Sequence, residues 1–203
     1  MREIHVREIE ETVRRLFLEA NFSLGPGVLE ALKAALEEEI SPLGREVLRE
    51  IIENARIASE ERIPLCQDTG LAVVFLEIGQ EVRLTGGDLR GAVNRGVRRA
   101  YAEGHLRKSV CHPLSRENTR DNTPAVIHLD LVPGDRVRIV ALPKGGGSEN
   151  TSRVTVLPPS AGREGIMGYV IDCVREAGPN PCPPILVGIG VGSSLEGAAI
   201  MAK

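Results

Sequence analysis

The chain has 203 residues and a net charge of −3, so its overall charge gives no reason to expect nucleic acid or an anionic membrane as a partner. Tryptophan is absent, and the few phenylalanines and tyrosines cannot supply the stacking platforms that single-stranded nucleic acids need. No apolar run of about 20 residues occurs, and the first residues lack the apolar region of a signal peptide. The sequence predicts a soluble, cytoplasmic protein with a single domain, residues 1–203.

The first 60 residues are predicted to form a helical block. Apolar residues recur at helical spacing over 3–20, 28–40 and 41–58, with charged residues between them. Gly25-Pro26-Gly27 separates the first two helices, and Ser41-Pro42 is typical of a helix N-terminus. We interpret the block as scaffold, with a partner-docking surface as the alternative.

A polar triplet, Cys66-Gln67-Asp68, follows the helical block. It lies between Pro64 and Gly70, directly before the apolar run 71–78, which predicts a buried strand. Polar groups held this rigidly at the entrance to a core strand cost free energy unless they are used, which indicates a binding or catalytic site. A cysteine taken alone is more often a small buried hydrophobic residue, and the four cysteines match no zinc or redox spacing.

The next segment combines a helix with a long polar loop. The pattern predicts a helix over 89–103 that ends at Gly104. Arg107 lies just beyond it and can either complement the helix C-terminus or bind an anion. Residues 109–123 are polar and irregular, as functional loops often are. The runs 125–132 and 136–142 are predicted to form a β-hairpin.

Two further loops carry glycine or proline. Three glycines within 144–150 allow a backbone to come close to a ligand, although a flexible linker is the alternative and the pattern is not a P-loop. A helix is predicted over 162–177, and it includes Cys173 as a structural residue. A proline-rich loop then presents Cys182 and leads into a predicted strand over 185–190. A last helix is predicted to begin near Ser194.

Together these elements predict an α+β (mixed α/β) fold. A small mixed β-sheet is flanked by helices, and an N-terminal helical block covers residues 1–60. Residues 61–203 then form the α/β part that carries the candidate site.

Three motifs occur in one order along the chain. They are Cys66-Gln67-Asp68-Thr69-Gly70, Lys144-Gly145-Gly146-Gly147-Ser148-Glu149-Asn150, and Asn180-Pro181-Cys182-Pro183-Pro184 with the glycines that follow. In this arrangement, with Arg107 between the first two, the chain resembles the iron–sulfur-dependent class I fumarate hydratases. That family includes the L(+)-tartrate dehydratases. The resemblance is to the α subunit, or to the N-terminal domain of the fused enzymes, and covers essentially the whole chain.

The resemblance implies a [4Fe–4S] cluster held by three cysteines, with one iron open to substrate. Cys66 and Cys182 match two of the ligand positions. The third position lies after the helix that begins near Ser194, outside this chain, and neither Cys111 nor Cys173 matches it. We therefore expect that this polypeptide alone does not hold an intact cluster. A β subunit, in an α2β2 heterotetramer, is the expected partner.

The resemblance also implies roles for individual side chains. Substrate contacts fall on Gln67, Asp68, Arg107 and Gly147, and Asp68 is the expected acid–base group. The expected reaction is the reversible hydration of fumarate to malate, a step of the tricarboxylic acid cycle. Two alternatives are an L(+)-tartrate dehydratase α subunit and a non-catalytic subunit that lacks the third ligand. Thr151, where the fused enzymes carry lysine, fits the two-subunit branch.

Overall fold

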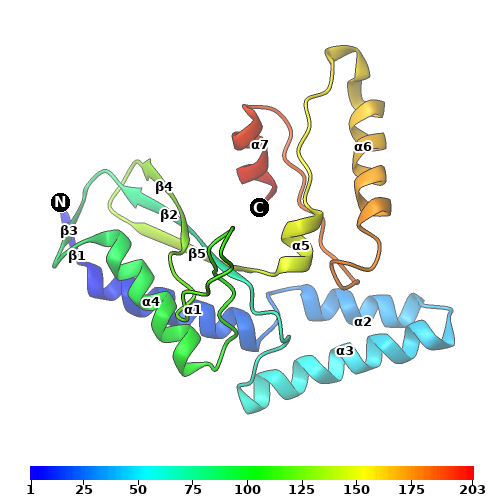
Figure 1. The fold of residues 1–203 in the computed structure, drawn as a ribbon, viewed down its shortest axis with the longest axis horizontal. Helices are drawn as coiled ribbons and strands as arrows, with labels where there is room; N and C mark the ends of the chain where they lie inside the picture. The colour runs from blue at the N-terminus through cyan, green and yellow to red at the C-terminus, as the bar shows by residue number, and fades with distance from the viewer. The chain divides into compact units, whose positions relative to one another are not determined.

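A computed structural model describes residues 1–203 and divides into two compact units, Met1–Lys144 and Gly145–Lys203 (Figure 1). The N-terminal unit contains β1 (Arg2–His5), α1 (Val6–Phe22), α2 (Val28–Glu38), α3 (Pro42–Glu61), β2 (Leu71–Gly79), β3 (Val82–Thr85), α4 (Leu89–Glu103), β4 (Val126–Val132) and β5 (Val137–Lys144). The C-terminal unit contains α5 (Gly146–Thr151), a short 3-10 turn (Pro159–Ala161), α6 (Gly162–Ala177) and α7 (Leu195–Ala202). None of these helices has both the length and the apolar composition needed to cross a bilayer.

The fold is mixed α/β, as the sequence predicted. The main sheet has the order β4-β2-β5, and β2 runs parallel to β4 and antiparallel to β5. A second, two-stranded sheet pairs β1 with β3 in parallel. Helices α1 and α4 lie side by side and cover one face of the main sheet (Figure 1).

The predicted hairpin of 125–132 with 136–142 is wrong, because β2 lies between these two strands. Val73, Val74 and Leu76 of β2 are almost fully buried. Such a strand loses most by lying at a sheet edge, whereas β4 and β5 carry charged residues that edge strands tolerate. The more apolar strand therefore takes the centre.

The predicted strand over 185–190 is also wrong, since this segment has no regular structure. Its two glycines lie against α7: an added Cβ would fall 1.8 Å from the Ala202 carbonyl at Gly188, and 2.0 Å from the Ala198 carbonyl at Gly190. Glycine lets the backbone of this segment pack directly against α7, and the segment pairs with no strand.

The predicted first helix begins later than expected, because residues 2–5 form β1. His5 caps α1: its Nδ1 accepts from the Arg7 amide at 3.1 Å, and its own amide donates to Glu8 Oε1 at 3.2 Å. This reciprocal pair satisfies two donors at the helix start and sets the boundary. The pairing of β1 with β3 joins residues about 80 positions apart, which local periodicity cannot reveal.

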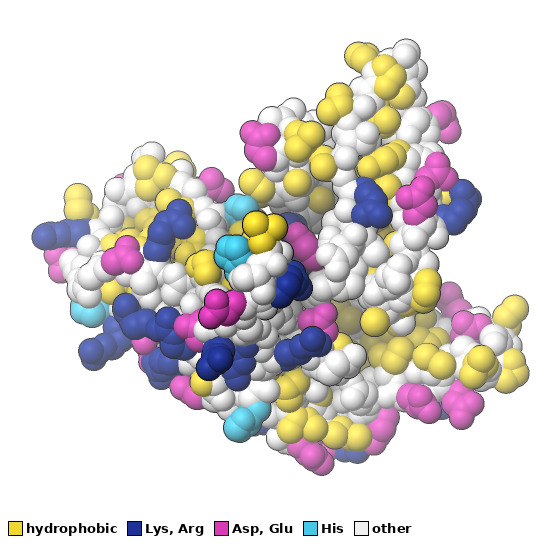
Figure 2. Space-filling model, in the orientation of Figure 1, with side chains coloured by type: hydrophobic (Ala, Val, Ile, Leu, Met, Phe, Trp, Pro, Cys, Tyr) yellow, Lys and Arg dark blue, Asp and Glu magenta, His cyan; other side chains and the backbone are white.

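The core of the N-terminal unit lies between α1, α4 and β2. Phe17, Val97 and Tyr101 are fully buried there, together with Val74 and Leu76. The C-terminal unit differs, because none of its residues is buried. Apolar side chains of α6 are exposed in the space-filling view (Figure 2), and the exposed ones include Met167, Ile171 and Val174.

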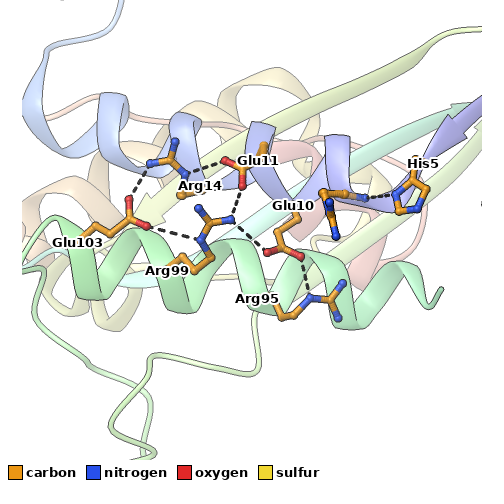
Figure 3. A network of polar contacts seen from close by, with 8 residues as sticks. His5, Glu10, Glu11, Arg14, Arg95, Arg99 and Glu103 are labelled. Carbon is orange, nitrogen blue, oxygen red and sulfur yellow. Dashed lines mark hydrogen bonds and ion pairs between the residues drawn. The ribbon is translucent and has the colours of Figure 1, made fainter. Parts of the chain in front are cut away.

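An ion-pair network links α1 to α4 beside this core (Figure 3). Glu10 is largely buried and accepts from Arg95 at 2.7 Å and from Arg99 at 3.2 Å. Arg14 binds Glu103 at 2.7 Å. The hydrogen bond from Arg95, more than any other contact, holds the pKa of Glu10 below its ordinary value. Two arginines of α4, Arg95 and Arg99, therefore tie the two helices together.

Gly96 sets the distance between α1 and α4. An added Cβ would lie 2.6 Å from the Glu10 carbonyl oxygen and 3.0 Å from Val13 Cβ. A Gly-to-Ala change inside a helix normally stabilises it by about 1 kcal/mol. We expect Gly96→Ala instead to lower the free energy of unfolding by about 1–3 kcal/mol, because backbone must move.

Urea unfolding followed by circular dichroism would measure the effect of Gly96→Ala. Gly168→Ala in α6 is the matched control, because its new Cβ would meet nothing within 4 Å. A Gly96→Ala protein as stable as the wild type would show that the helices do not approach this closely.

Candidate functional site

The first motif forms a loop between α3 and β2, which we call the site loop, residues 65–70. Its beginning is fixed on two sides: the Leu65 amide donates to the Asn21 carbonyl at 2.8 Å, and Asn54 Nδ2 donates to the Leu65 carbonyl at 2.9 Å. Asn21 lies in the last turn of α1, and Asn54 lies on α3. The helical block thus positions the site loop, as a scaffold would.

The polar triplet of the site loop is held by its own backbone. The Asp68 amide donates to Cys66 Sγ at 3.4 Å, and the Gly70 amide donates to Asp68 Oδ1 at 3.2 Å. Cys66 and Gln67 are exposed, whereas Thr69 and Gly70 are buried. The loop therefore buries its base and presents the thiol, the amide and the carboxylate above it.

Arg107 lies next to this loop. Its backbone carbonyl accepts a hydrogen bond from Thr69 Oγ1 at 3.0 Å, and its neighbour Leu106 is buried at the end of α4. The C-cap of α4 is Gly104, and the Arg107 side chain is exposed. The structure thus brings together the segments of Gln67, Asp68 and Arg107, which lie about 40 residues apart in the sequence.

Two buried residues near the loop carried no functional prediction. The Tyr101 hydroxyl lies 2.7 Å from the Thr69 carbonyl and 3.1 Å from the Gly70 carbonyl. Asn122 Nδ2 donates to the Gly70 carbonyl at 3.1 Å. Burial, reinforced by the negative charge of Asp68, raises the pKa of the Tyr101 phenol well above its ordinary value, so it stays a neutral donor. The sequence features that could have drawn attention to them are that Tyr101 is one of only two tyrosines and that Asn122 lies in the long polar loop.

That polar loop, residues 109–123, is ordered by contacts with α4. Arg98 Nε donates to Asp121 Oδ2 at 2.8 Å, and Asn94 Oδ1 accepts from the Ala125 amide at 2.8 Å. Burial alone would raise the pKa of Asp121, but hydrogen bonds from Thr123 and Arg98 outweigh it and lower the pKa to about 2. Charged Asp121 therefore stabilises the loop.

This depressed pKa predicts a pH dependence of stability. The contribution of Asp121 is complete above about pH 4 and is lost as the pH falls toward about 2, because the unfolded chain binds the proton more tightly. Asp121→Asn should lower the free energy of unfolding by about 1–2 kcal/mol near neutrality, and this difference should shrink in acid. Urea midpoints measured across this range test it, and Arg98→Gln should reproduce part of the effect. A difference that is constant with pH would contradict it.

The other two motifs meet within the C-terminal unit. Gly147 lies in the first turn of α5, where an added Cβ would fall 2.4 Å from the Asn180 carbonyl oxygen. Cys182 follows in a turn closed by its own amide, which donates to the Pro179 carbonyl at 3.0 Å. Glycine at 147 is thus required by close approach of the loop that carries Cys182.

The thiols suit a soft metal centre in their chemistry. Cys66 and Cys182 are free and exposed, whereas Cys111 and Cys173 are partly buried. Thiolates are the usual ligands of iron–sulfur clusters. No group of three His, Cys, Asp or Glu side chains is arranged so that it could hold a metal ion. The chain thus offers two suitable donors, one in each unit.

Comparison with known proteins agrees with the resemblance in the motifs. Residues 10–203 match the family model described as fumarate hydratase (fumerase). A protein of Methanocaldococcus jannaschii with the provisional name L(+)-tartrate dehydratase subunit alpha is 41% identical over 202 residues; the match covers 97% of this chain and 71% of that protein. The L(+)-tartrate dehydratase subunit alpha of Escherichia coli strain UTI89 is 30% identical, and the match covers 98% of this chain and 66% of that protein.

A family model that spans nearly the whole chain and a 41% identical relative lead to one assignment. This chain belongs to the fumarate hydratase and tartrate dehydratase α family of hydro-lyases.

Proposed function

We propose that this chain is the α subunit of a two-subunit, [4Fe–4S]-dependent hydro-lyase that adds water to fumarate to give malate, and removes it in reverse. The observation that carries this proposal is the hydrogen bond from Thr69 to the Arg107 carbonyl, which holds a carboxylate-bearing loop beside a guanidinium-bearing segment. A C4 diacid needs these groups: a cation for its carboxylate and an acid–base group for its proton.

The donor set supports the cluster. Cys66 and Cys182 would each supply a thiolate, and a third cysteine would come from polypeptide outside these 203 residues. When bound, a [4Fe–4S] cluster with one open iron supplies Lewis-acid chemistry for the hydroxyl that leaves or adds.

The remaining chemistry falls to this chain's own side chains. Arg107 is proposed to bind one substrate carboxylate bidentately, and Gln67 to orient the substrate from the neighbouring loop. Asp68 would move the proton at the carbon next to that carboxylate, where negative charge develops. The backbone at Gly147 would add amide donors to the same charge. The β subunit, expected in an α2β2 assembly, would complete the site.

A second candidate substrate is L(+)-tartrate, because both relatives named above are L(+)-tartrate dehydratase α subunits by name. Loss of water from tartrate gives an enol that becomes oxaloacetate. The same carboxylate clamp and proton-transfer group would serve both reactions. Tartrate differs from malate by one additional hydroxyl, which stays on the product when water is lost.

The test is reconstitution of the complete enzyme under anaerobic conditions, with its partner subunit and iron and sulfide. Ultraviolet absorbance follows fumarate formed from malate, and reduction of oxaloacetate by a coupled dehydrogenase follows tartrate. Fumarate turnover supports the proposal, and exclusive tartrate turnover supports the second candidate. If the cluster-loaded enzyme turns over neither malate nor tartrate, the proposal that this chain is a catalytic subunit of either enzyme is refuted, and a non-catalytic role is favoured.

A further inference from the structure

Three buried polar side chains connect the site loop to the Arg107 segment and to the core below it. They are Thr69, Tyr101 and Asn122, with exposed fractions of 3%, 0% and 0%. Each comes from a different part of the chain: the loop itself, α4 and the polar loop that follows α4. Polar groups this deeply buried are kept only where their hydrogen bonds are made, and these three make theirs to the two candidate segments.

Asn122 is the residue that joins both segments directly. Its Oδ1 accepts from the Ser109 amide at 2.6 Å and from the Val110 amide at 3.2 Å, just after Arg107. Its Nδ2 donates to the Gly70 carbonyl at 3.1 Å, just after Asp68. A single side-chain amide therefore uses its acceptor on one segment and its donor on the other.

Tyr101 supports the same junction from the core. Its hydroxyl is within hydrogen-bonding distance of the carbonyls of Thr69 and Gly70, while its ring packs against Phe17 at a centroid distance of 6.0 Å. The Gly70 carbonyl thus has two buried donors next to it, from Tyr101 and from Asn122. Because these donors and acceptors are buried, breaking their hydrogen bonds costs free energy, so they restrict the loop strongly.

The backbone at position 122 explains the residue type. Asn122 has a φ of +59°, in the left-handed region where asparagine is among the better tolerated residues. Neighbouring contacts hold it there, through Asp121 bound by Arg98 and Ala125 bound by Asn94. A short amide side chain with this backbone reaches both segments at once.

We propose that Asn122 is a positioning residue that fixes the Gln67–Asp68 loop relative to the Arg107 segment. Tyr101 assists it by holding the same loop. The importance of Asn122 for turnover rests on the function proposed above. A proton-transfer group and a carboxylate clamp must keep their relative placement to within a fraction of an ångström, and a misplacement of about 1 Å can cost about 100-fold in rate. Asn122 touches neither substrate nor cluster in this scheme and acts through Asp68.

Hydrogen–deuterium exchange on the complete α–β enzyme tests the positioning itself. Asn122→Ala should accelerate exchange in peptides covering residues 65–70 and 107–111 together. Tyr101→Phe, which keeps the ring in the core, should accelerate exchange in 65–70 alone. Val13→Ala is the control for general destabilisation, because Val13 of α1 is fully buried against Gly96 of α4 and belongs to neither segment. It should leave both peptides unchanged.

Kinetics then test whether the positioning acts through Asp68. Asn122→Ala should lower kcat/KM about 10-fold or more in the wild-type background. In the Asp68→Asn background the same change should cost less than about threefold, because the group it positions is already lost. A general loss of structure would instead lower kcat/KM by the same factor in both backgrounds. Any effect of Val13→Ala on kcat/KM should follow this second pattern.

The outcomes separate this inference from the function on which it rests. Unchanged exchange in 65–70 and 107–111 on Asn122→Ala overturns the positioning role, whatever the activity. Equal kinetic losses in the two backgrounds overturn action through Asp68. A wild-type enzyme inactive on C4 diacids refutes the proposed function, and exchange then decides by itself whether Asn122 joins the two segments.

Discussion

Asp68→Asn is expected to lower turnover of the assembled enzyme about 100-fold or more. Asparagine has the same shape and keeps an oxygen for the Gly70 amide, which now donates to Asp68 Oδ1 at 3.2 Å. The loop should therefore keep its conformation while the side chain loses the ability to take up and release a proton. Initial rates with malate or fumarate, together with the iron content of each preparation, measure the effect.

The matched control for this experiment is Asp88→Asn. Asp88 is also an aspartate that accepts from a backbone amide, at the N-cap of α4, but it belongs to no part of the candidate site. Asparagine is an equally good N-cap, so this variant should keep both stability and turnover. Full activity of Asp68→Asn with a normal cluster content would remove Asp68 from the mechanism.

Phe17→Ala is expected to lower the free energy of unfolding by about 3–5 kcal/mol. Phe17 is fully buried in the folded chain, with an exposed fraction of 0%. Its ring packs against that of Tyr101, with an angle of 57° between the ring planes. Removing it leaves a cavity where α1 and α4 cover the sheet. Small domains are stable by only about 5–15 kcal/mol, so this single change removes a large share of the total.

Urea unfolding monitored by circular dichroism measures the loss, and Phe17→Leu is the control. Leucine retains most of the apolar volume, so its cost should stay below about 1.5 kcal/mol. Because Phe17 supports the ring of Tyr101, Phe17→Ala should also loosen the site loop more than Phe17→Leu does. An alanine variant with wild-type stability would mean that the core between α1 and α4 is not packed as described.

Most elements and the motif residues were predictable from sequence, because both depend on local patterns. Apolar spacing gave α2, α3, α4 and α6, and the buried run after Gly70 gave β2. The proline and glycine around Cys66 predicted a rigid loop. The family followed from three motifs in order, and the comparisons over nearly the whole chain agree with it.

What local patterns could not supply was the partner of each element. The sequence paired 125–132 with 136–142 because they are neighbours in the chain, whereas burial of β2 decided the sheet order. Residues 185–190 have strand-like composition, but their glycines pack on α7. The pairing of β1 with β3 depends on contacts between distant residues, and local periodicity carries no information about these.

The same division holds for the candidate site. Sequence alone determined its chemistry, since a thiol, an amide and a carboxylate at one loop, with an arginine farther on, are properties of residue types. Only the tertiary structure decided how two of these segments are joined, through Tyr101 and Asn122, because a buried hydrogen bond depends on where distant backbones meet. Residue identity determines which groups can react, and packing determines which of them are held in a fixed position relative to one another.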